Sequence, residues 1–587
     1  MPARAPDDRW PSALVLIGYA VLALGMTHSW WTPLGGRTTA VNETDAALFS
    51  WLLGWTPHAL GTGQLPLFTD RLNFPTGVNL MWNNGMLLPG ILFAPVTLAF
   101  GGTATVTVLC TLGPALSAAS AYACLRALPR PGPKLPVLPA ALGGALFGFS
   151  PAVTAQALGH PNLVFNPLLP VLLLLSLRLM LDEHPSRRTA VLLGAAAGVQ
   201  VLIGEEMLFL TGVVVALLLA ALAVGHPAVA RRRWRRFSAA AMLALGVFAL
   251  VAGFPLGYQL LGPLRQHGSP FATAYYSVDL ANYVLPNELQ ALGGGPARPF
   301  PGGLEEHTAY LGWPLLLFAL AGLVLARRRP WIRVPLLVAS ATAVLALGPQ
   351  LTVLGQPTAV PLPWALLRGL PGFEHVIVTR FALLTAGLLG VALAVALHEA
   401  MRGRPLVRRY GLAAGVLALL PLLPAALPGM PTPAVPAFFT GPAVTDVACP
   451  GGSLLVLPFP RAGVTDAMRW QQAAGMSFAM PGGYFIGPAA DGEQPRFDAV
   501  PSSGSMTLVR ILKGVPPPRL TGPRRRVLAR DLLRWRVGSV AVGPMPNQAA
   551  MVGFLTDLFG QEPELVDGVY LWRDPTVELT DRGRSRS

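Results

Sequence analysis

Two carboxylates stand close together in a chain that has few charged residues. Glu43 and Asp45 flank Thr44 just after the first long apolar segment, although only 12% of the 587 residues are Asp, Glu, Lys or Arg. An apolar run at 46–55 follows, which places the pair where a loop meets the membrane surface. A carboxylate there can accept a proton from one substrate while the lipid part of a second substrate stays in the bilayer. Asp45 is therefore the candidate general base, with Glu43 as its substitute.

The same residues also have a local interpretation. Thr44 or Asp45 can serve as the N-cap of the helix that the run at 46–55 predicts, because small polar side chains accept hydrogen bonds from the first free amides of a helix. Capping and proton transfer are compatible, so both roles stay open for Asp45.

Arg380 is the candidate phosphate ligand. It lies in the segment Val376-Ile-Val-Thr-Arg-Phe381, at the predicted outer start of a span. Arginine forms paired hydrogen bonds to phosphate, and a positive charge on the outer side runs against the usual bias toward the cytoplasm. The alternative is an anchor that extends to lipid headgroups.

Other polar residues at predicted loops are candidates for substrate binding. Glu205 and Glu206 fall between two apolar segments, and carboxylates at membrane depth usually face a cavity; they can bind a sugar, pair with an arginine or lie in a solvated turn. His160 and Asn162, in Gly-His-Pro-Asn, can hold a hydroxyl or shuttle a proton, or form a surface turn.

Trp82, His307 and Tyr310 complete the substrate-binding candidates. Aromatic rings stack on sugar faces, but they also form the interfacial belt of membrane proteins. His58 and the run Glu305-Glu306-His307 lack the helical spacing of a motif such as H-E-x-x-H. We therefore expect no dedicated metal site and no cofactor.

Composition sets the class of protein. The chain is 53% hydrophobic with a mean hydropathy of +0.52, and its charged fraction is half the roughly 25% of soluble proteins. Many apolar runs approach the roughly 20 residues that cross a bilayer. The net charge of +15 comes largely from Arg clusters between these runs, which is typical of cytoplasmic anchors rather than of nucleic-acid binding.

The Arg clusters also predict the topology. Placing all of them in the cytoplasm allows one crossing between Asp45 and Arg126, so the broken apolar run at 86–101 is interpreted as a re-entrant or interfacial helix. This gives a cytoplasmic N-terminus and an outer C-terminus. The fold class is an α-helical polytopic membrane protein with about 11 spans, predicted near 12–30, 103–126, 137–152, 163–181, 189–204, 207–225, 238–260, 309–327, 333–349, 379–398 and 411–428.

We predict three regions along the chain. Residues 1–430 form the transmembrane domain, with a long first outer loop at 31–102. Residues 431–580 form a small extracytoplasmic α/β domain, because strand-like and helix-like segments alternate there. Its expected strands are 452–460, 537–542 and 566–572, and its expected helices are 466–476 and 548–559. Residues 581–587 are expected to be a disordered tail.

Several of these segments together resemble a known family. The chain resembles bacterial GT-C-type integral membrane glycosyltransferases, in particular a large uncharacterised actinobacterial group. The matching segments include Glu43-Thr-Asp45, Pro57-His58, Pro75-Thr-Gly-Val-Asn79 with Trp82, Gly159-His160-Pro-Asn162, Tyr310-Leu-Gly312, Thr379-Arg380-Phe381, Leu457-Pro-Phe-Pro460, Trp470-Gln471 and Gly482-Gly-Tyr484.

The resemblance implies a function. It implies a polyprenyl-phosphate sugar donor, inversion at the anomeric carbon, an acidic base at the position of Asp45, no metal requirement and residence in the bacterial plasma membrane. Many members have two adjacent acids there, whereas this chain has Glu-Thr-Asp, which leaves the role of Glu43 open.

Three functions are weighed against one another. A transferase would move a sugar to an envelope glycan, lipid or protein acceptor on the outer face. A transporter or flippase of lipid-linked sugars would favour ionisable residues deep in several spans, broken helices and repeat symmetry; the sequence has few such charges and no repeat. A non-catalytic envelope-assembly scaffold would use the tail as its binding module and leave Asp45 dispensable. The transferase is the function that the sequence favours.

Overall fold

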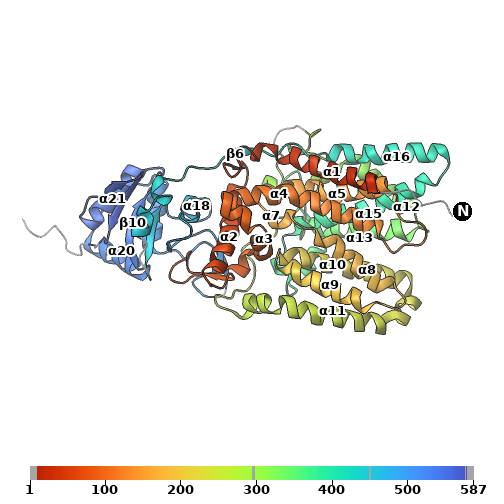
Figure 1. Cartoon of the computed structure of the whole chain (residues 1–587), viewed down its shortest axis with the longest axis horizontal. Helices are drawn as coiled ribbons and strands as arrows, with labels where there is room; N and C mark the ends of the chain where they lie inside the picture. Colours follow the sequence, from red (N-terminus) through yellow and green to blue (C-terminus); the bar gives the residue numbers. More distant parts are fainter. Residues whose placement is uncertain (1–8, 294–297, 448–450, 493, 576, 578–587) are drawn as a thin grey trace, which may run out of the picture. The chain divides into compact units, whose positions relative to one another are not determined.

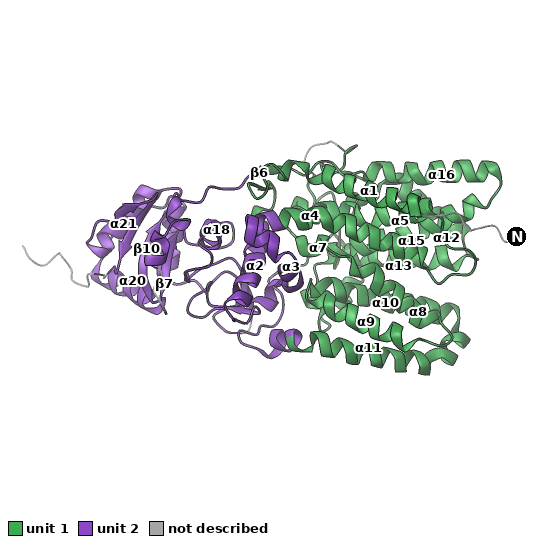
Figure 2. Cartoon of the chain, in the orientation of Figure 1, with its two compact units in different colours: residues 1–43, 106–254, 271–430 green, residues 44–105, 255–270, 431–587 purple. Residues whose placement is uncertain are grey.

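The computed structural model describes all residues except 1–8, 294–297, 448–450, 493, 576 and 578–587, so the expected tail at 581–587 lies outside the described part. Most of the ordered elements are helices (Figure 1). The contacts divide the chain into two compact units (Figure 2). Unit 1 comprises residues 1–43, 106–254 and 271–430, and unit 2 comprises residues 44–105, 255–270 and 431–587.

Eight helical segments among the described residues are long and apolar enough to cross a membrane. Two shorter apolar helices, α12 (Gly312–Leu325) and α13 (Pro330–Ala346), lie between them in sequence. The protein is therefore a multi-span helical protein, while the count of about 11 stays a prediction. The eight segments are Arg9–Trp30, Ala94–Arg126, Val137–Gln156, Pro161–Leu181, Glu205–Gly225, Pro227–Leu261, Val378–Met401 and Pro405–Leu422.

Helix α15 (Phe381–Met401) is buried along most of its length and organises unit 1. It packs against α5 (Val137–Gly148), α13 and α16 (Pro405–Leu419). A Cβ atom on Gly143 would lie 2.7 Å from the carbonyl oxygen of Gly390. Only glycine allows the backbones of α5 and α15 to approach this closely, as small residues do between membrane helices.

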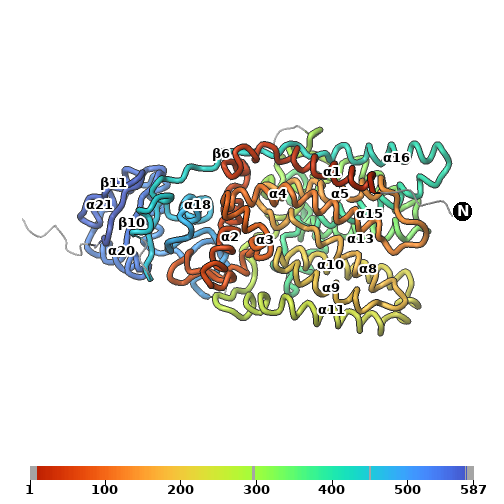
Figure 3. Tube along the Cα trace, in the orientation of Figure 1, coloured from red at the N-terminus to blue at the C-terminus, as the bar shows by residue number. Residues whose placement is uncertain are grey.

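A second group of helices in unit 1 packs side by side, and their path can be followed along the chain trace in Figure 3. Helix α8 (Leu168–Leu181) contacts both α9 (Arg187–Val201) and α10 (Glu205–Gly225), and α9 contacts α10. Two glycines of α9, Gly194 and Gly198, face α11 (Pro227–Leu261), where added Cβ atoms would collide with Ala244 and Val251. Small residues again set the helix spacing.

The predicted first outer loop contains a helix of its own. Helix α2 (Glu43–Gly61) begins at Glu43, so Thr44 and Asp45 lie in its first turn, and the prediction that either of them is the N-cap is wrong. The apolar run at 86–101 is not one continuous helix. It comprises α3 (Leu87–Leu92) and the start of α4 (Ala94–Arg126), which kinks at Gly101 with φ 82°.

A four-stranded sheet forms the core of the C-terminal part of unit 2. Its strand order is β11 (Glu564–Val566), β12 (Val569–Arg573), β10 (Val537–Val542) and β7 (Ser453–Leu457). β7 is parallel to β10, and the other neighbours are antiparallel. Buried residues of β7 and β10 share one apolar core with the helices α19 (Ser503–Leu512), α20 (Gly522–Arg534) and α21 (Gln548–Phe559). Strands and helices therefore do combine here, as expected from the sequence.

The expected strand at 566–572 is two strands. β11 (Glu564–Val566) and β12 (Val569–Arg573) form a hairpin in which Val566 faces Val569. The connecting residues, Asp567 and Gly568, both have positive φ, 44° and 88°. Asp-Gly is the pair that a two-residue hairpin turn of this geometry favours.

Candidate functional site

Asp45 has a defined hydrogen-bond partner far along the chain. The hydroxyl of Tyr484 donates to Asp45 Oδ1 at 2.6 Å, and both residues belong to unit 2. Both side chains are partly buried. Asp45 lies in the first turn of α2, where the helix dipole favours a negative charge. The bond from Tyr484 therefore orients the Asp45 carboxyl group.

Side-chain hydrogen bonds fix α2 against α18 (Asp466–Ala473). Trp51 Nε1 donates to Gln471 Oε1 at 2.7 Å, and Gln472 Nε2 donates to the carbonyl oxygen of Ser50 at 2.9 Å. The backbone amide of Tyr484 lies 3.3 Å from the sulfur of Met468, also in α18. One short helix thus contacts both α2 and the segment that carries Tyr484, which brings Tyr484 to Asp45.

A separate polar cluster, formed by Glu206, Glu306 and Arg380 with their neighbours, lies within unit 1. Arg380 Nη1 donates to Glu206 Oε2, and Glu206 Oε1 accepts the backbone amide of Ile377 at 3.0 Å. The side chains of Arg380 and Glu206 are only 10% and 13% exposed. Pairing with an arginine was one of the alternatives left open for Glu205 and Glu206, and Glu206 makes such a pair.

Glu306 is the most buried acid of this cluster, with its side chain 2% exposed. Its Oε2 accepts from the hydroxyl of Thr379 and, at 3.2 Å, from Gln156 Nε2. Its Oε1 lies 4.0 Å from Arg380 Nη2. Burial is the main cause that raises the pKa of Glu306 to about 7, opposed by the nearby His160 and by the bonds from Thr379 and Gln156. Near neutral pH the cluster therefore gains or loses a proton readily.

The cluster binds Arg380 tightly. Two carboxylates lie around one guanidinium, and Glu206 already occupies a donor of Arg380. A phosphate at this position would have to share the guanidinium with Glu206. Phosphate binding by Arg380 stays a prediction.

The structure distributes the remaining predicted site residues differently. His160 interacts electrostatically with Glu306, and Glu205 begins α10 beside Glu206. Asn162 is buried in α7 (Pro161–Val164). The other three lie elsewhere: His307 packs edge-on against Phe300, Tyr310 is buried, and Trp82 belongs to unit 2 in the short helix η2 (Leu80–Asn83). Glu43 is half-buried at the start of α2.

Sequence reasoning missed the roles of Glu306 and Tyr484. Glu306 was noted in the run Glu305-Glu306-His307, and Tyr484 in Gly482-Gly-Tyr484, but neither was predicted as a site residue. An acid next to a predicted span is costly unless it has partners, which was the available signal for Glu306. Among the described residues, no group of three or more His, Cys, Asp or Glu is arranged to hold a metal ion.

The fold is similar to that of membrane glycosyltransferases. The cryo-EM structure of the arabinofuranosyltransferase AftD from Mycobacteria matches with a TM-score of 0.53 at 17% identity, covering 97% of this chain and 40% of that one. The chain thus spans less than half the length of AftD. Two weaker matches are the oligosaccharyltransferase AglB from Archaeoglobus fulgidus (TM-score 0.48, 13% identity, coverage 92% and 70%) and ArnT from Cupriavidus metallidurans (0.42, 11%, 96% and 98%).

The similarity to AftD bears on the fold alone, and at that level it agrees with the multi-span fold of GT-C type that the sequence resemblance implied. The chain belongs to the family described as "Domain of unknown function (DUF6311)", whose model matches residues 13–419. No curated protein matches the chain.

Proposed function

We propose that this protein is an inverting membrane glycosyltransferase of the bacterial plasma membrane. It moves a sugar from a polyprenyl-phosphate donor to an envelope glycan, lipid or protein acceptor on the outer face, with residues 431–580 also on that side. The similarity of its fold to AftD supports the general class. The choice of donor and acceptor rests on the sequence resemblance.

The observation that carries the proposal is the bond from Tyr484 to Asp45. Asp45 was selected from the sequence as a base, and the structure gives it an orienting partner from the C-terminal part of the chain. A carboxylate can accept several hydrogen bonds, so an orienting bond from Tyr484 and a proton from the acceptor are compatible.

The chemistry follows from this arrangement. The acceptor hydroxyl oxygen attacks the anomeric carbon, the bond from that carbon to the phosphate oxygen breaks, and the lipid phosphate leaves. The hydroxyl proton passes to Asp45. Because attack comes from the face opposite to the leaving group, the anomeric configuration inverts. Tyr484 acts as a positioning residue that keeps the Asp45 carboxylate aligned.

Three variants of the full chain test the proposal. The measurement is the envelope glycan profile of a deletion strain that carries each variant at equal membrane level. We expect Asp45→Asn to lower transfer by roughly 100-fold or more, which is the usual loss on removing a general base. Tyr484→Phe removes one hydrogen bond to a charged group and should cost roughly tenfold.

Asp70→Asn is the matched control, because Asp70 is an exposed carboxylate of the same unit. It should leave the profile unchanged. If Asp45→Asn restores the glycan as well as wild type does, Asp45 is not the base and the proposed mechanism fails.

A further inference from the structure

Unit 2 contains a cavity that the proposed chemistry does not use. It has a volume of about 220 Å³, which is smaller than the roughly 300–1,000 Å³ of pockets for drug-sized ligands. Its lining comes mainly from three parts of unit 2, which are the loop after β2 (Phe68–Thr69), the segment around 481–505 and the end of α20, and Leu264 and Phe459 add to it from two other segments. A space of this size suits one small ring.

The lining offers apolar faces. Phe74, Phe459, Phe485 and Trp535 all contribute to the cavity, and each is at most 8% exposed. Sugar rings present C–H groups on their faces, and aromatic rings bind such apolar surface while the hydroxyl groups point outward. Four aromatic side chains around one small cavity therefore favour a ring with apolar faces.

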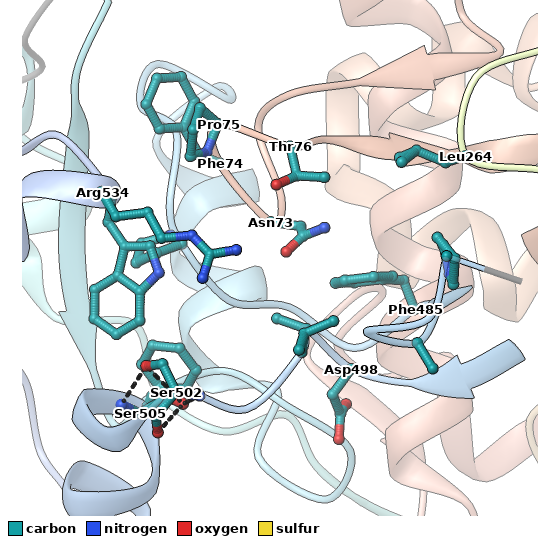
Figure 4. Close-up of a pocket in the computed structure, with 18 residues that line it drawn as sticks. Asn73, Phe74, Pro75, Thr76, Leu264, Phe485, Asp498, Ser502, Ser505 and Arg534 are labelled. Atoms are coloured by element: carbon teal, nitrogen blue, oxygen red, sulfur yellow. Dashed lines mark hydrogen bonds between the residues drawn. The ribbon is translucent and has the colours of Figure 1, made fainter. Parts of the chain in front are cut away.

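The lining also offers unused hydrogen-bonding groups. Among the described residues, Asn73 Oδ1, the Trp535 indole N–H and the Arg534 guanidinium have no hydrogen-bond partner, although Trp535 is more than nine-tenths buried. Figure 4 shows the Arg534 side chain extending across the space toward Asn73. These groups can therefore bind ligand hydroxyl groups without breaking an existing hydrogen bond within the protein.

Two polar lining residues adopt an uncommon backbone conformation. Asn73 and Asp498 have φ of 53° and 67°, and hydrogen bonds from their amides to the carbonyl oxygens of Gly482 and Phe485, both 2.9 Å, hold them there. Residues other than glycine that adopt the left-handed backbone conformation cluster at functional sites, where the surrounding structure maintains the strain. Asp498 also accepts the Ala462 amide at 2.5 Å, which fixes its carboxylate.

We infer that this cavity binds one saccharide residue of a glycan, and that the acceptor of the proposed transfer is therefore a glycan rather than a lipid or a protein side chain. The identification of the bound glycan as the acceptor rests on the proposed function, whereas the binding of a saccharide does not. The cavity carries one acidic and one basic side chain, Asp498 and Arg534, so the lining favours a neutral sugar with several hydroxyl groups over a phosphate or a nucleic acid.

The test uses the full chain in lipid nanodiscs and ligand-detected NMR. The probes are the methyl glycosides of common hexoses and pentoses at millimolar concentration. We expect at least one glycoside to bind wild type, and the double variant Asn73→Ala/Arg534→Ala to bind it about tenfold more weakly, because two hydrogen bonds are lost. Arg530→Ala is the matched control: Arg530 is an exposed arginine of the same helix and should leave binding unchanged.

The outcomes separate the two proposals. Binding of no glycoside to wild type, or equal binding by wild type and the double variant at equal thermal stability, overturns the saccharide site. Asp45→Asn should abolish transfer and still bind the glycoside. If the double variant loses binding but transfers sugar to a non-glycan acceptor as well as wild type does, the site binds a saccharide but does not hold the acceptor.

Discussion

At the scale of single residues, the two acidic sites are held in different ways. Asp45 accepts a hydrogen bond from the hydroxyl of Tyr484, which orients the carboxylate. Glu206 has a cationic partner, Arg380, in a pair that is nearly buried. A buried ion pair fixes structure more than it offers a reactive group, because removing either partner leaves an uncompensated charge. The Glu206–Arg380 pair is therefore better suited to fixing structure than to proton transfer.

The buried carboxyl group of Glu306 predicts a dependence of the protein's stability on pH. Its pKa is raised by burial from 4.5 to about 7, so between these values the folded protein retains a proton that the unfolded chain has released. The contribution of Glu306 to the free energy of unfolding should therefore be largest below pH 4.5 and be lost as pH rises toward 7. Glu306→Gln cannot ionise and should flatten this decline, which thermal unfolding midpoints at stepped pH values would measure.

The control for this prediction is Glu288→Gln, which changes an exposed carboxylate of the same unit that is not among the groups acting on Glu306, and it should keep the wild-type decline. Parallel curves for wild type and Glu306→Gln would show that Glu306 does not titrate in this range.

The sequence predicted only part of the chemistry at this scale. Glu43-Thr-Asp45 was visible because acids are rare in this chain and this pair follows an apolar segment. The pairing of Glu206 with an arginine was one of the stated alternatives. The partner of Asp45 could not be derived, because Tyr484 lies 439 positions away, and only the folding of unit 2 brings the two together.

At the scale of elements, the position of α2 depends on a glycine of α4. A Cβ atom on Gly102 would lie 2.2 Å from both Gln472 Nε2 and the carbonyl oxygen of Ser50. These two atoms form the hydrogen bond that joins α18 to α2. Gly102 therefore allows three segments of unit 2 to meet at one point.

Gly102→Ala should consequently destabilise the protein by about 1–3 kcal/mol, the usual cost of an overpacked site, and lower transfer through displacement of α2. The unfolding midpoint and the glycan profile would both be measured. Gly246→Ala is the comparison, since a Cβ atom on Gly246 of α11 meets nothing within 4 Å. Equal midpoints for the two variants would contradict the tight approach at Gly102.

Element boundaries were predictable where the local signal was strong. The expected strand at 537–542 and the expected helix at 548–559 coincide with β10 and α21. The prediction of one continuous strand at 566–572 was wrong, because the turn at Asp567 and Gly568 interrupts it. Helices α19 and α20 were not predicted, since their burial depends on a sheet whose strands come from distant parts of the chain.

At the scale of the whole molecule, the charge pattern predicts which loops lie on the cytoplasmic side and which on the outer side, and contacts inside unit 1 join loops of the same predicted side. Residues predicted to face the cytoplasm contact one another: Arg232 and Arg233 lie 3.6 Å and 3.5 Å from Glu183, and Arg329 pairs with Glu399 at the end of α15. The residues of the Glu206–Glu306–Arg380 cluster, predicted to face outward, likewise contact one another. These contacts join loops that the charge pattern placed on the same side, while the topology and the side of the membrane stay predictions.

Helix α11 offers the sharpest test of that orientation. Its 35 residues extend roughly 50 Å at 1.5 Å per residue, which exceeds a hydrocarbon core of about 30 Å. The surplus includes the cluster Arg231–Arg236 in its first turns, and basic residues next to a span favour the cytoplasmic side. The helix should therefore start in the cytoplasm and end outside.

Reporter fusions after His226, before α11, and after Gly268, beyond it, would measure this directly. Green fluorescent protein should fluoresce only at the first position, and alkaline phosphatase should be active only at the second and at the C-terminus of the full chain. The same reporter active at both positions would mean that α11 does not cross the membrane. Exchanged activities would invert the topology and place Asp45 on the cytoplasmic side, where a donor and an acceptor on the outer face could not reach it.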